Sequence, residues 1–140
     1  GEEIARAAAA AIPLEHPEAP DLAFLYGTIL TDGGNGASGR PSRNVCIFAG
    51  RQVDRSPTGS GVTARMALQR ARREAVTGEE RVFESCTGAT FTGRIVRDAE
   101  PVAGRRAVIV EVGGRADFTG EARFRFDADD ALREGFTLGL

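Results

Sequence analysis

Apolar and polar positions alternate along the chain in two rhythms, one typical of a helix and one typical of strands. From residue 64 to residue 75, apolar side chains recur at intervals of three and four, and Thr77-Gly78 ends the pattern. Arginines and a glutamine occupy the opposite side. Upstream, the apolar run 44–49 predicts a short strand buried on both faces. The helical spacing predicts an amphipathic helix whose apolar stripe consists of Ala64, Ala67, Leu68, Ala71 and Ala75.

The chain after this helix has the pattern of strands. The segments 81–86, 89–97 and 106–112 are rich in strand-forming residues and are separated by Gly and Pro. From residue 116 to residue 126, apolar even positions alternate with polar odd positions, which predicts a further strand with one buried face. One helix among mostly antiparallel strands predicts an α+β fold. The apolar positions of the last segment are Ala116, Phe118, Ala122, Phe124 and Phe126.

Composition and charge narrow the class of protein. The formal charge is −2, from 18 Lys+Arg and 20 Asp+Glu, so no positive surplus attracts nucleic acid or an anionic membrane. The chain contains no lysine, which excludes a Schiff-base lysine from it. No apolar run is long enough to span a bilayer, and we expect a cytoplasmic location. At 140 residues, the chain can bury one modest core.

Residues for metal or thiol chemistry are sparse. The sole histidine, His16, precedes Pro17 and is expected to pack or hydrogen-bond in a loop. Together with dispersed acids it makes no metal-ligand cluster, so we expect no metal. Cys46 and Cys86 lie in strand-like apolar segments and are expected to be buried, unreactive thiols.

The segment 54–63 carries the strongest functional signal. It places an acid (Asp54), a proline, a hydroxyl (Thr58) and two glycines (Gly59 and Gly61) at the start of the predicted helix. Backbone N–H groups at a helix start are unpaired, and the helix dipole adds roughly half a positive charge there. The segment therefore predicts a binding site for a small carboxylate.

Two glycine patterns also fit a dinucleotide-binding fingerprint formally. Residues 59–64 match G-x-G-x-x-A, and Glu79 lies at a suitable distance for a ribose contact. That fingerprint follows its strand almost directly, whereas polar residues and Pro57 intervene here. Residues 34–39 match G-x-G-x-x-G, but no helical pattern follows, which favours a flexible surface loop. A nucleotide site is therefore disfavoured.

Residues 54–65, Asp-Arg-Ser-Pro-Thr-Gly-Ser-Gly-Val-Thr-Ala-Arg, resemble the second active-site motif of the proline racemase superfamily. Racemases and 4-hydroxyproline epimerases of that group have a cysteine where this chain has Thr58. A threonine at this place resembles the trans-3-hydroxy-L-proline dehydratase branch. The resemblance continues over essentially the whole chain, in His16-Pro17, Pro20-Asp21, residues 22–32, Phe91-Thr92-Gly93 and residues 129–136.

The resemblance implies a two-lobed fold of the diaminopimelate epimerase type, with a central helix wrapped by strands in each lobe. We expect residues 1–101 to form the latter part of the C-terminal lobe, and residues 102–140 to supply strands and a tail that pack against a missing N-terminal lobe. The family's first motif, with the catalytic cysteine, is absent, and Gly1 to Ala11 begins without Met or an N-cap. We therefore expect the C-terminal part of a larger enzyme. A homodimer is left open.

The resemblance also implies a reaction without a cofactor. A cysteine in the missing half would remove the Cα proton of trans-3-hydroxy-L-proline, and Thr58 would act on the departing 3-hydroxyl. The product would be Δ1-pyrroline-2-carboxylate. Amides of Gly59, Ser60 and Gly61 would hold the carboxylate, Asp54 the ring nitrogen, and Phe48 would wall the apolar side of the ring.

Simpler structural roles and other functions remain open. Asp54 is also a common turn former, Thr58 a common N-cap, and Phe48 a typical core residue. A proline racemase or hydroxyproline epimerase is the first alternative function. It is disfavoured because a threonine hydroxyl is too weak an acid to replace a second thiol. A non-catalytic fragment that binds a small carboxylate is the second.

Overall fold

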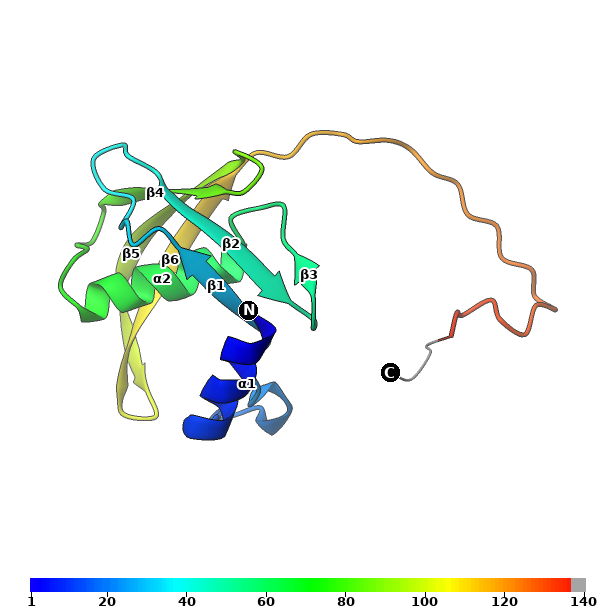
Figure 1. Cartoon of the computed structure of the whole chain (residues 1–140), viewed down its shortest axis with the longest axis horizontal. Coiled ribbons are helices and arrows are strands. Elements are labelled where there is room, and N and C mark those ends of the chain that lie inside the picture. The colour runs from blue at the N-terminus through cyan, green and yellow to red at the C-terminus, as the bar shows by residue number, and fades with distance from the viewer. Residues whose placement is uncertain (137–140) are drawn as a thin grey trace.

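A mixed sheet with one long helix packed across it forms the body of the protein in the computed structural model, which describes residues 1–136 (Figure 1). The α+β class is confirmed, with a second helix, α1, at the N-terminal end. The strand order in the six-stranded sheet is β1-β2-β4-β5-β6, and β3 pairs with β2. The elements are α1 (Glu2–Ala11), a 3-10 turn (Pro20–Leu22), β1 (Gly27–Thr31), β2 (Ser42–Phe48), β3 (Gln52–Val53), α2 (Gly59–Ala71), β4 (Glu80–Ser85), β5 (Thr90–Val102) and β6 (Arg105–Gly114).

Strand β2 divides its pairing between two neighbours. β1 pairs with it antiparallel from Asn44 to Phe48, so β3 and β4 share the opposite edge. β4 runs parallel to the first part of β2, and β3 runs antiparallel to its last part. The segment 54–58 leaves β3 at this division, where the N–H of Asp54 donates to the carbonyl of Cys46 (3.0 Å). The start of α2 therefore lies next to the point where β2 changes partner from β4 to β3.

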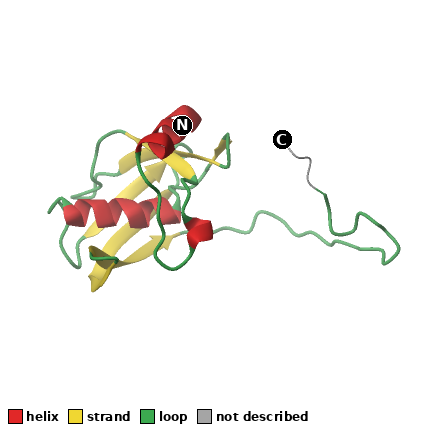
Figure 2. Cartoon of the chain, turned by 90° about the horizontal axis from the view of Figure 1, so that it is seen from below, coloured by secondary structure: helices red, strands yellow, loops and turns green. Residues whose placement is uncertain are grey.

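Helix α2 crosses one face of the sheet (Figure 2), and the core lies between the two. Val62 and Met66 of α2 are fully buried against Phe83 of β4 and Ile95 of β5. Gly93 permits this close approach, because a Cβ there would lie 2.8 Å from a methyl carbon of Val62. The predicted strands at 81–86, 89–97 and 106–112 are confirmed as β4, β5 and β6.

The prediction of which helix face is buried was wrong. The buried residues of α2 are Gly61, Val62, Met66 and Gln69, whereas most of the predicted apolar stripe, including Leu68, is exposed. One methyl group buries little area, so the single Met and Val outweigh a row of alanines. β2 likewise buries one face only, that of Ser42, Asn44 and Cys46, and not both.

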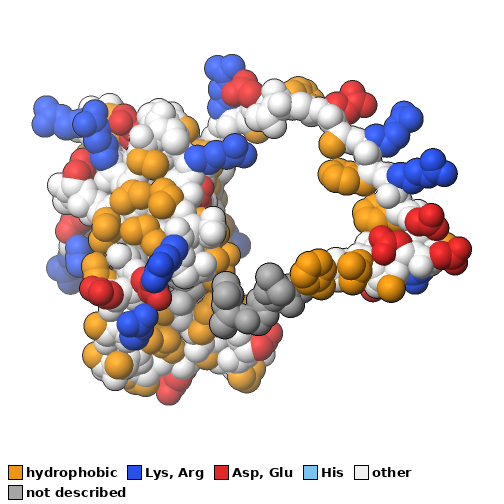
Figure 3. All heavy atoms as spheres, turned by 45° about the vertical axis from the view of Figure 1, so that its right-hand side comes forward, with side chains coloured by type: hydrophobic (Ala, Val, Ile, Leu, Met, Phe, Trp, Pro, Cys, Tyr) orange, Lys and Arg blue, Asp and Glu red, His pale blue; other side chains and the backbone are white. Residues whose placement is uncertain are grey.

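The alternating segment 116–126 is not a strand. It extends away from the body without secondary structure (Figure 3). Phe118, Phe124 and Phe126 are exposed. A strand exists only where a neighbour accepts its hydrogen bonds, and no other strand of residues 1–136 pairs with this segment. The boundary that we expected after residue 101 falls in the β5–β6 hairpin, so β6 belongs to this sheet. That the tail packs against another lobe stays a prediction. Neither helix within residues 1–136 is long and apolar enough to cross a membrane.

Candidate active site

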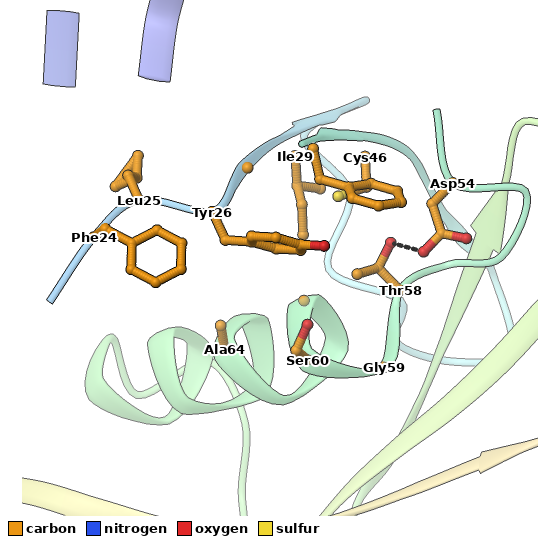
Figure 4. A pocket seen from close by; sticks show the side chains of 13 residues that line it. Phe24, Leu25, Tyr26, Ile29, Cys46, Asp54, Thr58, Gly59, Ser60 and Ala64 are labelled. Carbon is orange, nitrogen blue, oxygen red and sulfur yellow. Dashed lines mark hydrogen bonds between the residues drawn. The ribbon is translucent and has the colours of Figure 1, made fainter. Parts of the chain in front are cut away.

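An open pocket of about 530 Å³ lies at the start of α2, between this helix and β1 and β2 (Figure 4). The fold brings all the predicted site residues together here, from β2, the segment 54–58 and the first turn of the helix. Cys46 and residues of the segment before β1 complete the lining. The residues that line the pocket are Phe24, Leu25, Tyr26, Gly27, Ile29, Cys46, Phe48, Asp54, Thr58, Gly59, Ser60, Gly61 and Ala64.

Thr58 occupies an unusual backbone conformation at the mouth of the helix. Its φ is 69° and its ψ is 104°, a region that a β-branched residue rarely adopts and that costs about 1–3 kcal/mol. The side chain makes no capping hydrogen bond to α2, so the N-cap role is not performed by its hydroxyl. Instead, Thr58 Oγ1 donates to Asp54 Oδ2 at 2.9 Å (Figure 4). The strained backbone of Thr58 thus occurs together with a hydroxyl that points toward Asp54.

Asp54 has a structural role and also faces the pocket. Its Oδ1 accepts the N–H of Ser56 at 2.8 Å, which closes the turn, and its Oδ2 accepts the hydroxyl of Thr58. Burial raises the pKa of Asp54, but the hydrogen bonds from Ser56 and Thr58 outweigh it, so the net pKa is lower than the ordinary value. Asp54 is therefore an anion at neutral pH, with spare lone pairs for a positively charged donor.

The first amides of α2 are unpaired. The first backbone bond into the helix runs from the N–H of Val62 to the carbonyl of Thr58 (2.8 Å). Within the described residues, the N–H groups of Gly59, Ser60 and Gly61 have no backbone or side-chain acceptor, as expected for a first helical turn. Together with the helix dipole they suit a carboxylate in the pocket.

The two glycines of this turn serve different purposes. A Cβ on Gly59 would meet nothing within 4 Å, so this glycine borders open space. A Cβ on Gly61 would lie 2.2 Å from Cδ1 of Ile29 in β1. Packing against Ile29 therefore requires a glycine at position 61, whether or not a ligand also needs one there.

Aromatic side chains form the wall of the pocket opposite the helix. Phe48 at the end of β2 is half-buried, and its ring centroid lies 5.5 Å from that of Tyr26. Phe24 meets Tyr26 edge-to-face at 6.2 Å. Sequence reasoning missed Tyr26 and Phe24, because only the pairing of Gly27 with Phe48 brings the segment before β1 to the end of β2. The one available signal was that Tyr26 is the sole tyrosine.

The remaining candidates lie where packing places them. His16 accepts the N–H groups of Glu18 and Ala19 through Nδ1, as expected for a loop histidine. Cys46 is buried as predicted, but the prediction for Cys86 was wrong, since it is exposed in the turn after β4. Residues 1–136 contain no cluster of three or more His, Cys, Asp or Glu side chains that could hold a metal ion.

The contrast between Gly59 and Gly61 is testable by unfolding. We expect Gly61→Ala to lower the free energy of unfolding by about 1–3 kcal/mol, because the added methyl overlaps Ile29. Gly59→Ala is the matched control, with no loss of stability. Adding Ile29→Val removes the overlapping Cδ1 and is expected to restore part of the loss. Urea denaturation measures all of these variants, and equal stabilities of the two alanine variants would contradict the packing argument.

The hydrogen bonds of Asp54 predict a dependence of stability on pH. Because the folded-state pKa of Asp54 is lower than the ordinary value of an aspartate, the ionised carboxylate stabilises the fold at pH values above that ordinary value. This contribution is lost as the pH falls through the lowered pKa. Asp54→Asn is therefore expected to be less stable than the unchanged chain near pH 7, with the difference shrinking toward about pH 2. Urea unfolding across this range tests it, and a constant difference would refute the assignment.

Comparison with known proteins places this geometry in a family. The sequence matches the family described as Proline racemase over residues 1–137. It is 51% identical over 136 residues to the trans-3-hydroxy-L-proline dehydratase of Homo sapiens, covering 96% of this chain and 38% of the human protein. It is 42% identical over 138 residues to the 3-hydroxyproline 2-epimerase of Burkholderia multivorans, covering 99% of this chain and 41% of that protein.

Solved structures share the fold. A probable proline racemase from Agrobacterium radiobacter K84 with bound carbonate superposes with a TM-score of 0.80 at 27% identity, covering 99% of this chain and 39% of that chain. A hydroxyproline epimerase from Agrobacterium vitis with bound trans-4-hydroxy-L-proline superposes with a TM-score of 0.79 at 29% identity, covering 97% and 38%. The chain thus spans less than half the length of its relatives. Matched from residue 1 to residue 137, it belongs to the proline racemase family.

Proposed function

We propose that this chain is part of a trans-3-hydroxy-L-proline dehydratase, which eliminates water from its substrate to give Δ1-pyrroline-2-carboxylate. One observation carries the proposal: the hydroxyl of Thr58 donates a hydrogen bond to Asp54 and lies next to the unpaired N–H groups at the start of α2. The higher identity to the human dehydratase than to the Burkholderia epimerase, 51% against 42%, supports the same choice.

The site accounts for binding of an imino acid. Removal of the Cα proton makes the substrate carboxylate enolate-like, and donors already aimed at its oxygens lower that barrier. The N–H groups of Gly59, Ser60 and Gly61 are those donors. The Asp54 carboxylate, whose pKa is lowered, accepts a hydrogen bond from the protonated ring nitrogen of the substrate. Phe48 closes the apolar side of the ring.

Thr58 distinguishes elimination from inversion. Inversion needs a second acid on the opposite face of the ring, and a threonine hydroxyl is too weak an acid for that step. A hydroxyl can nevertheless rotate and donate to an oxygen that is leaving carbon 3. The Cα–H and C3–O bonds then break, the proton and the hydroxyl leave as water, and the enamine tautomerises to the cyclic imine. No cofactor takes part.

The base that removes the Cα proton lies outside this chain in our proposal. We assign it to a cysteine in the missing part of the same enzyme, which we place N-terminal to this chain, and we propose a cytoplasmic location for the whole. Since the pocket is open to solvent, a facing lobe would close it over the substrate.

A hydroxyproline epimerase is the second candidate. The Burkholderia relative carries the epimerase name at 42% identity, and the Agrobacterium vitis structure holds trans-4-hydroxy-L-proline. Incubating the complete enzyme with trans-3-hydroxy-L-proline separates the two. Formation of the cyclic imine supports the dehydratase, whereas accumulation of the D-isomer without imine would overturn it. Calorimetry of the isolated chain with pyrrole-2-carboxylate tests the non-catalytic alternative, a fragment that binds a small carboxylate.

Thr58→Ala tests the role of the hydroxyl. We expect the rate of imine formation by the complete enzyme to fall by at least about 100-fold, within the range for loss of a positioned proton donor. Binding of pyrrole-2-carboxylate, measured by calorimetry, should change little, because the amides that hold the carboxylate remain. Near-normal turnover would reduce Thr58 to a structural residue.

A further inference from the structure

The carbonyl groups of the segment 54–58 are held by side chains from outside it. Asn44 of β2 donates from Nδ2 to the carbonyl of Pro57 at 3.2 Å. Ser85 and Thr87, at the end of β4 and in the turn that follows, both donate to the carbonyl of Arg55 at 2.7 Å. We call Asn44, Ser85 and Thr87 the loop clamp. The loop clamp therefore holds two carbonyl groups before Thr58 by hydrogen bonds from β2 and from the end of β4.

Arg65 of α2 determines which way the amide of Asn44 faces. Its Nη1 donates to Asn44 Oδ1 at 3.2 Å, and a guanidinium can only donate. The oxygen of Asn44 must therefore face Arg65, which leaves the NH₂ group for the carbonyl of Pro57. The side-chain amide of an asparagine can otherwise adopt either of two flipped orientations, and the contact with Arg65 allows only one of them.

Arg65 is itself held firmly. Its guanidinium lies 4.6 Å from the ring centroid of Phe83 and donates to the carbonyl of Gly34 and to the hydroxyl of Ser42. Ser42 is fully buried, and its hydroxyl lies within hydrogen-bond distance of two acceptors, the carbonyl of Gly34 (2.8 Å) and Asp32 Oδ1 (3.1 Å). No carboxylate within the described residues forms a salt bridge with Arg65. The partly buried guanidinium thus donates to neutral partners, and one of them, Asn44, donates to Pro57 in the segment 54–58.

We propose that the loop clamp, with Asn44 oriented by Arg65, positions Thr58 for the elimination; this inference rests on the proposed function. The carbonyl of Pro57 belongs to the same peptide plane as the N–H of Thr58. The carbonyl of Thr58 on the other side of its Cα accepts the N–H of Val62 in α2 (2.8 Å). With both sides held, the rotation by which Thr58 would leave its positive φ of 69° is restricted. The clamp thereby fixes the hydroxyl and the next amide, that of Gly59, relative to the substrate. Asn44, Ser85 and Thr87 are positioning residues and do not touch the reacting atoms.

Asn44→Asp in the complete enzyme tests the clamp, with Gln69→Glu as the matched control. Both residues are amides with 6% exposure, and each donates to a backbone carbonyl, but Gln69 donates to Asn35, outside the segment 54–58. Asn44→Asp keeps the acceptor for Arg65 and loses the donor to Pro57. We expect its kcat for imine formation to fall about 10- to 100-fold, as for a misplaced catalytic group, with KM within about threefold. Gln69→Glu should keep kcat within about twofold of the unchanged enzyme.

Three results decide the inference. A kcat of Asn44→Asp equal to that of Gln69→Glu, or a KM that rises as far as kcat falls, overturns it. If Asn44→Asp does not fold, the double variant Ser85→Ala/Thr87→Val removes the other half of the clamp, and unchanged kcat there overturns it equally. An unchanged enzyme that forms no imine refutes the proposed function instead, so the two failures are distinct.

Discussion

The positive φ of Thr58 is the constraint on which the rest of the site depends. It turns the chain from the segment 54–58 into α2, directs the hydroxyl toward Asp54, and leaves the next three amides facing the pocket. A β-branched residue reaches this conformation only where its surroundings enforce it. Here the segment leaves the sheet where β2 changes partner from β4 to β3, and side chains of β2 and β4 donate hydrogen bonds to it.

Local signals in the sequence predicted the α+β class and which candidate site residues lie together, but not how the helix packs. Asp54, Thr58 and the glycines are close in sequence, and the helix start brings them together whatever the tertiary structure. Phe48 was reached through the family resemblance. Tyr26 was missed because its place depends on the register of β1 with β2, which no local pattern encodes. The loop clamp was missed for the same reason, since Asn44 and Ser85 approach the segment only through the sheet.

Two of the errors about the fold share one physical cause. Periodicity predicts which positions lie on one face, but only tertiary contacts decide whether that face is covered. The predicted apolar stripe of α2 and the alternating tail were expected to be buried, but most of the stripe and the phenylalanines of the tail are exposed in residues 1–136. Larger side chains decided the packing of α2, with Met66 and Val62 inward. In a chain that spans 38% of the length of its human relative, apolar faces left uncovered are those that further structure could cover.

The polar interior beneath the helix has a cost that packing alone does not justify. Arg65 is desolvated, which lowers its pKa, and Gln69 leaves its Oε1 without a partner. Apolar side chains of similar volume would bury the same area without that penalty. Arg65 lies next to Asn44 and Ser42, where the hydrogen bonds that lead to Pro57 begin. Gln69 instead donates to Asn35, and Arg81 of β4 leaves Nε and Nη1 without a partner. The part of this cost that Arg65 carries lies behind Thr58, as expected when a fold maintains a strained functional group.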